Sequence, residues 1–545
     1  MDFQIGFSRI DFVILFAYFG LLLFNGIWHG RKTKKSDDFI LGGKSFGTLT
    51  TLATQGATMK GGGALLGYSG GAFQSGLGVL FATTTYNIGA WVAVIVGIAR
   101  KLKKCSSSVN IRSSGDILYA RFPSMSLKRL GGLGAAWLTL GTLNGQMAAI
   151  ALLLNLAFGR YGLSFGAALV IGATICTIYT IYGGLMSVAY NDLLQWFIMT
   201  PMIFLVLPYM LIRAGATPTA IHEGLDAAKY FTLKPSIWWL GFLISGILSA
   251  MSDLNHLTRY ISAKDEKVAV RGSMFGFGYT TLFAGVVIVF GLSAALFLTP
   301  DQVPTRDATM FVLSAKVLPA GIFGLFMAAV LATVVSTMDS NLQTTVQSVM
   351  VDLVEPILSP STSEKTKLFF YRICTAFVAA ISIYMVLQLK SIVHLFSLGF
   401  TIYSSSMFFP LMSTMFWKKA TKQGVLTGIL VGAVTSIVAL KMSLPLPVVW
   451  GVAASSIAGV VVCFLTLGKE GETPLLPGFN EIGLPIDRKI FWGCLMGLAG
   501  TLIFSVGHAS WINWPLIAVG SILMVLCVMV VDKAFKDYPI EGLKS

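Results

Sequence analysis

Long apolar stretches alternate with short polar segments along the whole chain. Apolar runs of about 18 residues or more are typical of helices that cross a membrane, whereas a transmembrane β-barrel shows short segments of alternating polarity. The pattern therefore predicts an all-α integral membrane protein with about 15 spans (about 13–15). We expect these spans near residues 9–28, 47–72, 76–99, 130–156, 163–183, 191–213, 236–256, 273–298, 319–348, 368–389, 391–416, 422–441, 446–467, 490–507 and 513–532.

The composition agrees with a membrane protein. Of the 545 residues, 55% are hydrophobic and 12% are charged, whereas soluble domains carry about 25% charged residues. The loops are short, so we predict a single membrane domain over residues 1–545. The first apolar run, 9–28, lacks a basic leader and a small-residue cleavage site. We expect it to be a retained span and not a signal peptide.

The basic residues are concentrated in loops on one side of the predicted membrane. Examples are RKTKK (31–35), RKLKK (100–104) and WKKATK (417–422). Cytoplasmic loops are enriched in lysine and arginine. We therefore attribute the net charge of +15 to the orientation of the protein in the membrane and not to nucleic-acid binding. We expect a multi-pass plasma-membrane protein with the N-terminus outside and the C-terminus in the cytoplasm. The six cysteines are scattered without a metal-binding spacing.

The stretch ATMKGGGALLGYSGG (57–71) places Lys60 and three consecutive glycines inside a predicted span. A charge at the bilayer centre costs about 2.5–3.5 kcal/mol, and each glycine weakens a helix by about 1 kcal/mol relative to alanine. We expect the helix to break here and its free carbonyl and N–H groups to line a site for an ion or a solute. Two alternatives remain: the glycines only allow close helix packing, or Lys60 reaches toward a membrane surface.

Three other segments place polar side chains at membrane depth. In 181–199, Asp192 and Gln195 share a helix face after a Tyr-Gly-Gly turn, although Asp192 could simply cap the helix. The segment 324–348 carries Thr333, Ser336, Thr337, Asp339 and Ser340. Oxygen ligands of this kind suit a hard cation, and helix packing is the alternative. In 251–272, Asp253, Asn255 and His256 end a span and Arg259 opens a basic loop, either lining an exit path or lying at an ordinary interface.

Several motifs together resemble the sodium:solute symporter family, which includes bacterial proline, sialic acid and sugar symporters. They occur in the family's order over about residues 37–420. The resemblance implies a LeuT-type fold, with two inverted repeats of five helices at 47–213 and 236–416 and with peripheral helices at 9–28 and 422–532. The motifs are DDFILGGKSFG (37–47), GYSGGAFQSG (67–76), SSGDILYARFP (113–123), YGGLMSVAYNDLLQ (182–195), DLNHLTRYISAKDEKVAVRG (253–272) and LATVVSTMDS (331–340).

The same resemblance implies the residues of the transport site. The main sodium site would take backbone carbonyls from the first broken helix and hydroxyls from the eighth core helix, which correspond to Ala57, Lys60, Thr333, Ser336 and Thr337. A second cation or proton site would use Asp192, Asp339 and Ser340. Substrate contacts would come from Thr58, Met59, Lys60, Gly61, Gln146, Asp253 and His256, with Trp238 and Trp239 as stacking surfaces.

Lys60 departs from the family pattern, which has an apolar residue at this position. An ammonium group close to a bound sodium ion would repel it strongly. We consider three hypotheses: Lys60 replaces the sodium ion and the coupling ion becomes a proton, Lys60 binds an anionic solute such as a carboxylate, or Lys60 pairs with Asp339 or Asp192.

The sequence thus predicts a secondary active symporter that imports a small organic solute by alternating access, coupled to Na⁺ or H⁺. The alternative is a transporter-like membrane sensor without net transport. We expect no enzyme and no further cofactor, because HExxH and phosphate-loop motifs are lacking. Discontinuous helices suit alternating access better than a continuous channel pore. The expected partners are the solute and the lipid bilayer. The sequence does not determine the oligomeric state, and a monomer is one of the possibilities.

Overall fold

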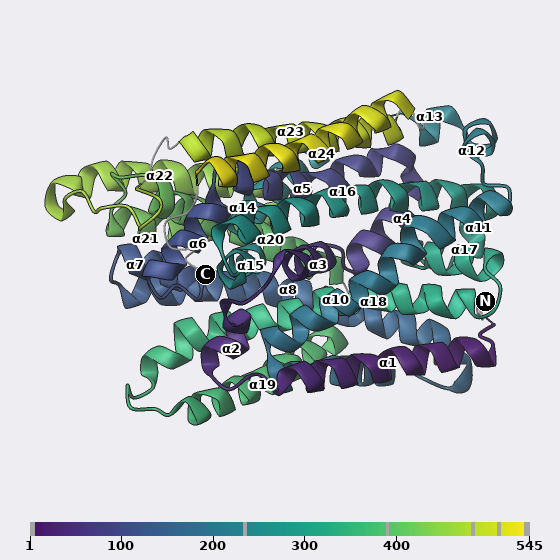
Figure 1. Ribbon diagram of the computed structural model, residues 1–545, viewed down its shortest axis with the longest axis horizontal. Helices are drawn as coiled ribbons and strands as arrows, with labels where there is room; N and C mark the ends of the chain where they lie inside the picture. Colours follow the sequence, from purple (N-terminus) through teal and green to yellow (C-terminus); the bar gives the residue numbers. More distant parts are fainter. Residues whose placement is uncertain (1–5, 233–236, 389–391, 481–484, 510–513, 539–545) are drawn as a thin grey trace.

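The computed structural model describes residues 6–232, 237–388, 392–480, 485–509 and 514–538. Most of its helices run along the long axis of the molecule (Figure 1). Ten of the described helices are long and apolar enough to cross a membrane. The predicted all-α class is confirmed, and the strand-like pairing within the described ranges is limited to the isolated bridge between Phe46 and Ala263. The number of about 15 spans stays a prediction.

Thirteen α-helices are described between residues 9 and 230. They are α1 (Arg9–Gly30), α2 (Ser36–Leu41), α3 (Thr48–Thr58), α4 (Tyr68–Ser75), α5 (Leu80–Ile95), α6 (Ile98–Ser108), α7 (Ser114–Arg121), α8 (Met125–Phe158), α9 (Phe165–Gly183), α10 (Leu185–Pro201), α11 (Leu207–Arg213), α12 (Pro218–Gly224) and α13 (Ala227–Tyr230). A π-helical segment, η2 (Gly63–Gly67), precedes α4.

The second half continues the bundle. Its helices are α14 (Ile237–Ser252), α15 (Leu254–Ser262), α16 (Glu266–Phe297), α17 (Thr309–Val317), α18 (Ile322–Ser348), α19 (Glu364–Gln388), α20 (Ile392–Phe416), α21 (Lys422–Lys441), α22 (Pro447–Glu470), α23 (Pro485–Ala509) and α24 (Trp514–Asp537). Two short segments, η8 (Val349–Val354) and η9 (Glu355–Ile357), extend α18.

Several helices begin at polar side chains that satisfy their first free N–H groups. Ser8 Oγ accepts a hydrogen bond from Asp11 N (3.3 Å) at the start of α1. Asp265 Oδ1 accepts one from Val268 N (2.7 Å) at the start of α16. Such caps stabilise a helix by about 0.5–2 kcal/mol, and they place the polar loops outside the apolar runs.

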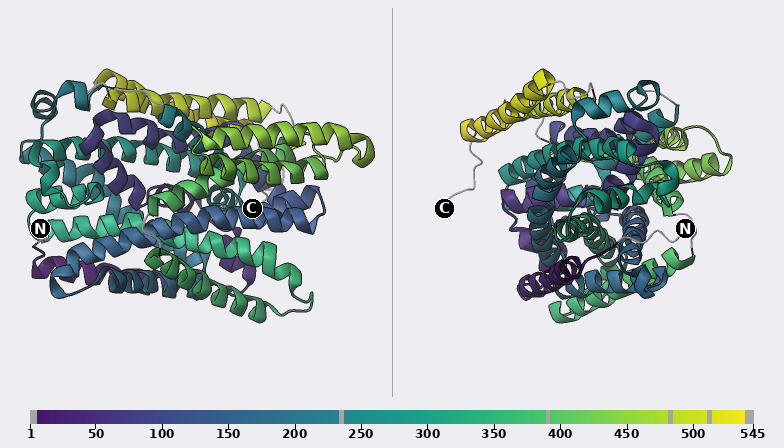
Figure 2. Two further views of the ribbon diagram at one scale, coloured as in Figure 1. Left: turned by 180° about the vertical axis from the view of Figure 1, so that it is seen from behind. Right: turned by 90° about the vertical axis from the view of Figure 1, so that its right-hand side faces the viewer.

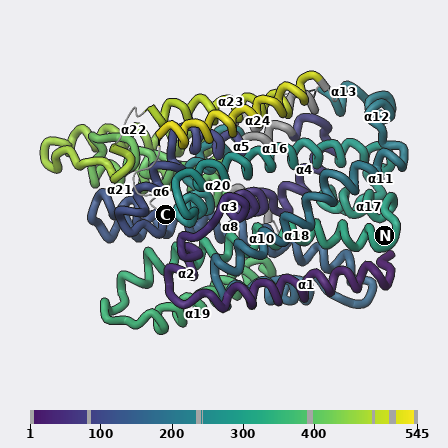
Figure 3. The backbone as a smooth tube through the Cα atoms, in the orientation of Figure 1, coloured from purple at the N-terminus to yellow at the C-terminus, as the bar shows by residue number. Residues whose placement is uncertain are grey.

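Two core helices are interrupted. The helix α3 ends at Thr58, and the helical path resumes at η2 and α4 (Figure 3). This break lies where the glycine run predicts it. The second break separates α14 from α15 at Asp253, which has extended backbone (φ −63°, ψ 122°) and caps α15 by accepting a hydrogen bond from Asn255 N (2.8 Å). The sequence analysis placed Asp253 at the end of a span and missed this continuation.

The peripheral helices pack as pairs on the outside of the bundle. Helices α23 and α24 pack on each other and on α5 and α16, and the end-on view shows this pair at the periphery (Figure 2). Helices α21 and α22 form a second pair beside α20. Helix α1 packs on α9, α10 and α18. The limits of the two repeats, 47–213 and 236–416, stay predictions.

The helices α2, α6, α7 and α21 gather at one end of the bundle, which we call the α7 end (Figure 1). The basic segments 31–35 and 417–422 adjoin α2 and α21, and 100–104 lies within α6. The predicted grouping of the basic loops on one side therefore agrees with the arrangement of the helices.

Candidate ion and substrate site

The end of α3 meets the middle of α18 in a cluster of oxygen atoms. Ser336 Oγ donates to the Ala57 carbonyl (3.2 Å), and Thr337 Oγ1 lies 3.1 Å from the Thr58 carbonyl and 3.4 Å from that of Ala57. Ser336 Oγ also lies 3.2 Å from the Thr333 carbonyl. All these residues are buried. Carbonyl and hydroxyl oxygens without a net charge suit a hard monovalent cation, so this donor set fits sodium.

Thr333 takes part in the cluster through its backbone. Its hydroxyl donates to the Ala329 carbonyl (2.9 Å) within α18, which leaves its own carbonyl for the cluster. The structure thus brings together Ala57, Thr333, Ser336 and Thr337. Lys60 is the fifth residue of the predicted sodium site, and its backbone N donates a hydrogen bond to the Ala57 carbonyl (3.2 Å).

The Lys60 side chain is buried beside Tyr68. The residue is 2% exposed, and Nζ lies 5.8 Å from the centre of the Tyr68 ring, within range of a cation–π interaction. Among the described residues, Nζ has neither a carboxylate within ion-pair distance nor a hydrogen bond to Ser336 or Thr337. Lys60 is therefore a buried cation without an anionic partner in this part of the chain.

The two aspartates proposed as partners of Lys60 are engaged elsewhere. Asp192 Oδ2 accepts a hydrogen bond from Thr54 Oγ1 (2.6 Å), and Asp339 Oδ2 accepts one from Tyr179 OH (2.6 Å). The hypothesis that Lys60 pairs with Asp192 or Asp339 is wrong for this conformation. Each aspartate retains a buried Oδ1 atom without a hydrogen-bond partner in the described structure.

The break after α3 is closed by Gln146 from α8. Its Oε1 accepts a hydrogen bond from Gly62 N (2.7 Å). A Cβ atom at Gly61 would lie 2.6 Å from both terminal amide atoms of Gln146, whereas a Cβ atom at Gly63 would meet nothing within 4 Å. Close approach of Gln146 to the backbone therefore requires glycine at position 61 and not at position 63.

We expect Gly61→Ala to reduce solute uptake strongly and Gly63→Ala to preserve most of it. The new methyl group at position 61 displaces the Gln146 amide, and such overpacking costs about 1–3 kcal/mol. The measurement is initial uptake in proteoliposomes reconstituted with equal amounts of each variant. Equal activity of the two variants would show that Gln146 does not shape the site.

Arg259 is the largest departure from the sequence analysis, which placed it at the start of a basic loop. It lies on α15 and is 0% exposed. Its NH2 donates to Thr58 Oγ1 (2.9 Å) and Ser340 Oγ (2.6 Å), and its Nε to Thr54 Oγ1 (3.3 Å). Its NH1 donates to the carbonyl (3.1 Å) and Oδ1 (3.2 Å) of Asn255. The i, i+4 spacing of Asn255 and Arg259 is the sequence signal that both occupy one helix face.

The predicted second site is therefore organised around Arg259. Ser340 Oγ is hydrogen-bonded to the guanidinium and to Thr58 Oγ1 (2.8 Å). Thr54 Oγ1 links Arg259 to Asp192, since it contacts both. Asp339 belongs to the same region of α18 but binds Tyr179.

The predicted substrate residues gather around the two breaks. Thr58, Met59, Gly61 and Gln146 lie at the first, and Asp253 and His256 at the second. Tyr86 OH, which the sequence analysis missed, donates to Asp253 Oδ2. His256 Nδ1 is 2.8 Å from Gln55 Oε1 of α3, so the two breaks are joined by a side-chain contact. Trp238 and Trp239 lie on α14, and their side chains fall outside the described part of the structure.

The fold and these two broken helices define a secondary active symporter, and the comparisons agree. The model of the sodium:solute symporter family matches residues 39–432, and the chain belongs to that family. It is 28% identical over 500 residues to the sodium/proline symporter of Haemophilus influenzae, covering 87% of this chain and 97% of that protein. It is 25% identical to the osmoregulated proline transporter OpuE of Bacillus subtilis, covering 84% and 95%.

A solved structure shares the fold. It is the substrate-bound outward-open state of a Na⁺-coupled sialic acid symporter, with a TM-score of 0.73, 20% identity, and coverage of 86% of this chain and 100% of that one. The chain is a multi-pass membrane symporter and not an enzyme. Membership of the family implies Na⁺ as the coupling ion.

Proposed function

We propose that the chain is a sodium-coupled symporter for a small solute that carries a carboxylate, and that Lys60 is the counter-charge of this carboxylate. The observation that carries the proposal is the buried Lys60 ammonium, which has no carboxylate within ion-pair distance among the described residues. A buried unpaired charge is costly. A solute carboxylate would remove that cost when it binds.

The coupling ion is proposed from the oxygen cluster at Ala57, Thr333, Ser336 and Thr337. If Lys60 replaced sodium, its ammonium would donate to the Ser336 and Thr337 hydroxyls. Instead, these hydroxyls are hydrogen-bonded to backbone carbonyls, and Nζ lies near Tyr68. This geometry favours sodium at the cluster over a proton carried by Lys60. Proline and sialic acid, named for the similar proteins, are both carboxylic acids, which supports the solute class.

We also propose Asp192, Asp339 and Ser340 as a second cation or proton site. Two buried carboxylates, each with an unpartnered oxygen, lie near one guanidinium. When both are ionised, the group carries one uncompensated negative charge, which a second sodium ion or a proton would balance. A sodium-to-solute ratio above one, measured from the reversal potential in proteoliposomes, supports a second sodium ion.

The proposed orientation places the α7 end in the cytoplasm of the plasma membrane, with the N-terminus outside and the C-terminus inside. The basic segments that adjoin α2, α6 and α21 support it, because cytoplasmic loops are enriched in lysine and arginine. A membrane sensor without net transport is the alternative function, and absence of uptake under any gradient would favour it.

The test is uptake in proteoliposomes with an imposed sodium gradient or an imposed pH gradient, using a panel of carboxylates, amino acids and sugars. We expect sodium to drive uptake of a carboxylate. Loss of a hydrogen bond to a charged group costs about 1.5–3 kcal/mol, so Lys60→Ala should raise the solute KM by about tenfold to a hundredfold. Lys60→Arg should retain more affinity than Lys60→Ala.

The matched control is Lys264→Ala, which removes an exposed lysine and should leave the solute KM unchanged. Uptake driven by pH and not by sodium, and abolished by Lys60→Ala, would mean that Lys60 has replaced the ion. Sodium-driven uptake of a neutral sugar with an unchanged KM in Lys60→Ala would refute the counter-charge role.

A further inference from the structure

The short helix α2 joins the peripheral helix α1 to the broken helix α3, and it is held by α18 and α19. Ser36 donates to Glu364 Oε2 from its backbone N (3.0 Å) and from its hydroxyl (2.9 Å). Gln343 Nε2 donates to the Phe39 carbonyl (2.7 Å). The Phe39 ring packs on the Tyr371 ring at a centre-to-centre distance of 5.5 Å. The backbone of α2 therefore has one anchor on each of two neighbouring helices.

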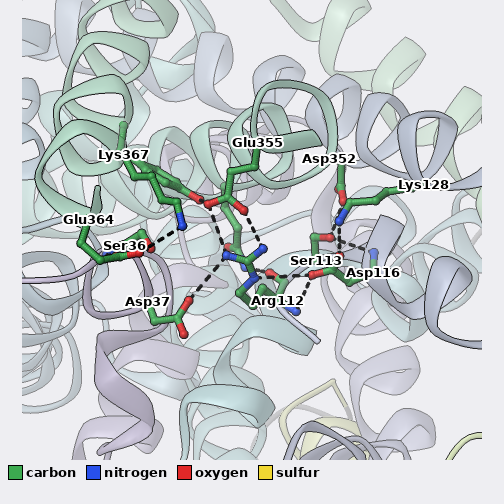
Figure 4. A network of polar contacts seen from close by, with 12 residues as sticks. Ser36, Asp37, Arg112, Ser113, Asp116, Lys128, Asp352, Glu355, Glu364 and Lys367 are labelled. Carbon is green, nitrogen blue, oxygen red and sulfur yellow. Dashed lines mark hydrogen bonds and ion pairs between the residues drawn. The ribbon is translucent and has the colours of Figure 1, made fainter. Parts of the chain in front are cut away.

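Beside α2 lies a stronger pair that does not include it (Figure 4). Arg112 binds both carboxylate oxygens of Glu355 (2.6 and 3.2 Å), and Tyr371 OH donates to Glu355 Oε1 (2.8 Å). The Arg112 and Glu355 side chains are 14% and 12% exposed, and bidentate pairs of this kind are strong. Asp37 of α2 reaches Arg112 only at 3.6 Å, with a side chain that is 50% exposed. Exposed pairs contribute little.

The network is therefore asymmetric. Arg112, Glu355 and Tyr371 join the segment before α7, η9 and α19 into a fixed base. The helix α2 is attached to its surroundings by the polar contacts of Ser36 with Glu364 and of Asp37 with Arg112. Its apolar side chains Phe39, Ile40 and Leu41 are buried.

The position of α2 also connects it to the ion site. The helices α3 and α18 meet at the oxygen cluster, where Ser336 contacts Ala57. They are also joined through α2, where Gln343 contacts Phe39. Gln343 follows Ser336 by seven residues, which is about two turns of the same helix face. The two contacts therefore lie along one face of α18, one at α3 and the other at α2.

We propose that α2 is a latch for the gate at the α7 end of the transporter. Its contacts with Glu364 and Gln343 hold α3 against α18 and α19 while the ion site is formed, and they separate when ion and solute are released at this end. Alternating access requires each end to open in turn, so the latch is needed whether the coupling ion is sodium or a proton.

The test measures the distance between α2 and α19 directly. Spin labels are attached to Lys34→Cys and Lys365→Cys, two exposed positions beside the latch, and electron–electron distances are recorded in liposomes with and without sodium and solute. The six native cysteines are free and buried. Any labelling of these cysteines is measured on the protein without the two introduced cysteines. We expect a short distance to dominate with sodium and a longer one to gain population without it.

The variant Ser36→Ala should raise the long-distance population about two- to tenfold under all conditions, because it removes one hydrogen bond of the closed state. The matched control Ser361→Ala removes an exposed hydroxyl whose hydrogen-bond partner within the described part of the chain is Ser359, and it should change nothing. A single distance in all conditions and variants would overturn the proposal, as would a lower thermal stability of Ser36→Ala with an unchanged distance distribution.

The two proposals fail in different ways. If sodium leaves the wild-type distance unchanged but Ser36→Ala lengthens it, the choice of coupling ion is wrong and the latch stands. If Ser36→Ala does not fold, the wild-type distances with and without ion and solute still decide whether α2 leaves α19.

Discussion

Sodium-driven uptake is expected to disappear when Ser336 is replaced by alanine and Thr337 by valine in the same chain. Their two hydroxyls face the Ala57 and Thr58 carbonyls across the junction of α3 and α18. Each interaction of a dipole with a charged group contributes about 1.5–3 kcal/mol, so sodium affinity should fall by about a hundredfold or more. Backbone carbonyls alone would leave the ion with too few ligands.

The measurement is the sodium dependence of initial uptake in proteoliposomes. Ser348→Ala is the control on the same helix, because among the described residues its hydroxyl bonds to the Thr344 carbonyl alone, one turn earlier. It should behave like the wild type. Each single variant, Ser336→Ala or Thr337→Val, should show an intermediate loss. Wild-type sodium dependence in the double variant would place the ion elsewhere.

Arg259→Lys is expected to abolish transport and to lower thermal stability. The guanidinium satisfies oxygens of Thr54, Thr58, Asn255 and Ser340 with all five of its N–H groups. A lysine has three donors on one nitrogen, so some of these buried oxygens lose their partner. Each such loss costs about 1–3 kcal/mol.

Thermal unfolding in detergent and uptake in proteoliposomes together test this expectation. Arg129→Lys, at an exposed position, is the control and should match the wild type. Arg259→Gln should be more damaging than Arg259→Lys, because it also removes the positive charge near Asp192. Full uptake by Arg259→Lys would show that the charge suffices and that the planar arrangement of donors does not matter.

The first break and the hydroxyl groups that meet it could be predicted because their signals are local. A lysine and three glycines inside an apolar run cannot form an ordinary lipid-facing helix, and the structure breaks α3 there. The hydroxyl face of α18 follows from the spacing of Ser336, Thr337 and Ser340. The resemblance supplied the partner carbonyl at Ala57.

The remaining features depend on packing that sequence spacing does not encode. The second break consists of the single extended residue Asp253. No glycine or proline stands at this position to indicate a break in the sequence. Arg259 follows the end of an apolar run, and in the sequence alone this position is typical of a basic loop. The structure shows that it lies within helix α15. Tyr86 lies in an apolar segment and gains a role only through Asp253. The direction of the Lys60 side chain likewise depends on the placement of Tyr68.

The contact between Gln55 and His256 has a kinetic consequence. It joins α3, which carries the Ala57 and Thr58 carbonyls, to α15, which begins at the second break. Gln55 also donates to Ser273 on α16 (3.2 Å), so its amide is fixed on both sides. The two interrupted helices are therefore linked by a buried side-chain hydrogen bond. Any movement of α3 relative to α15 has to break this bond.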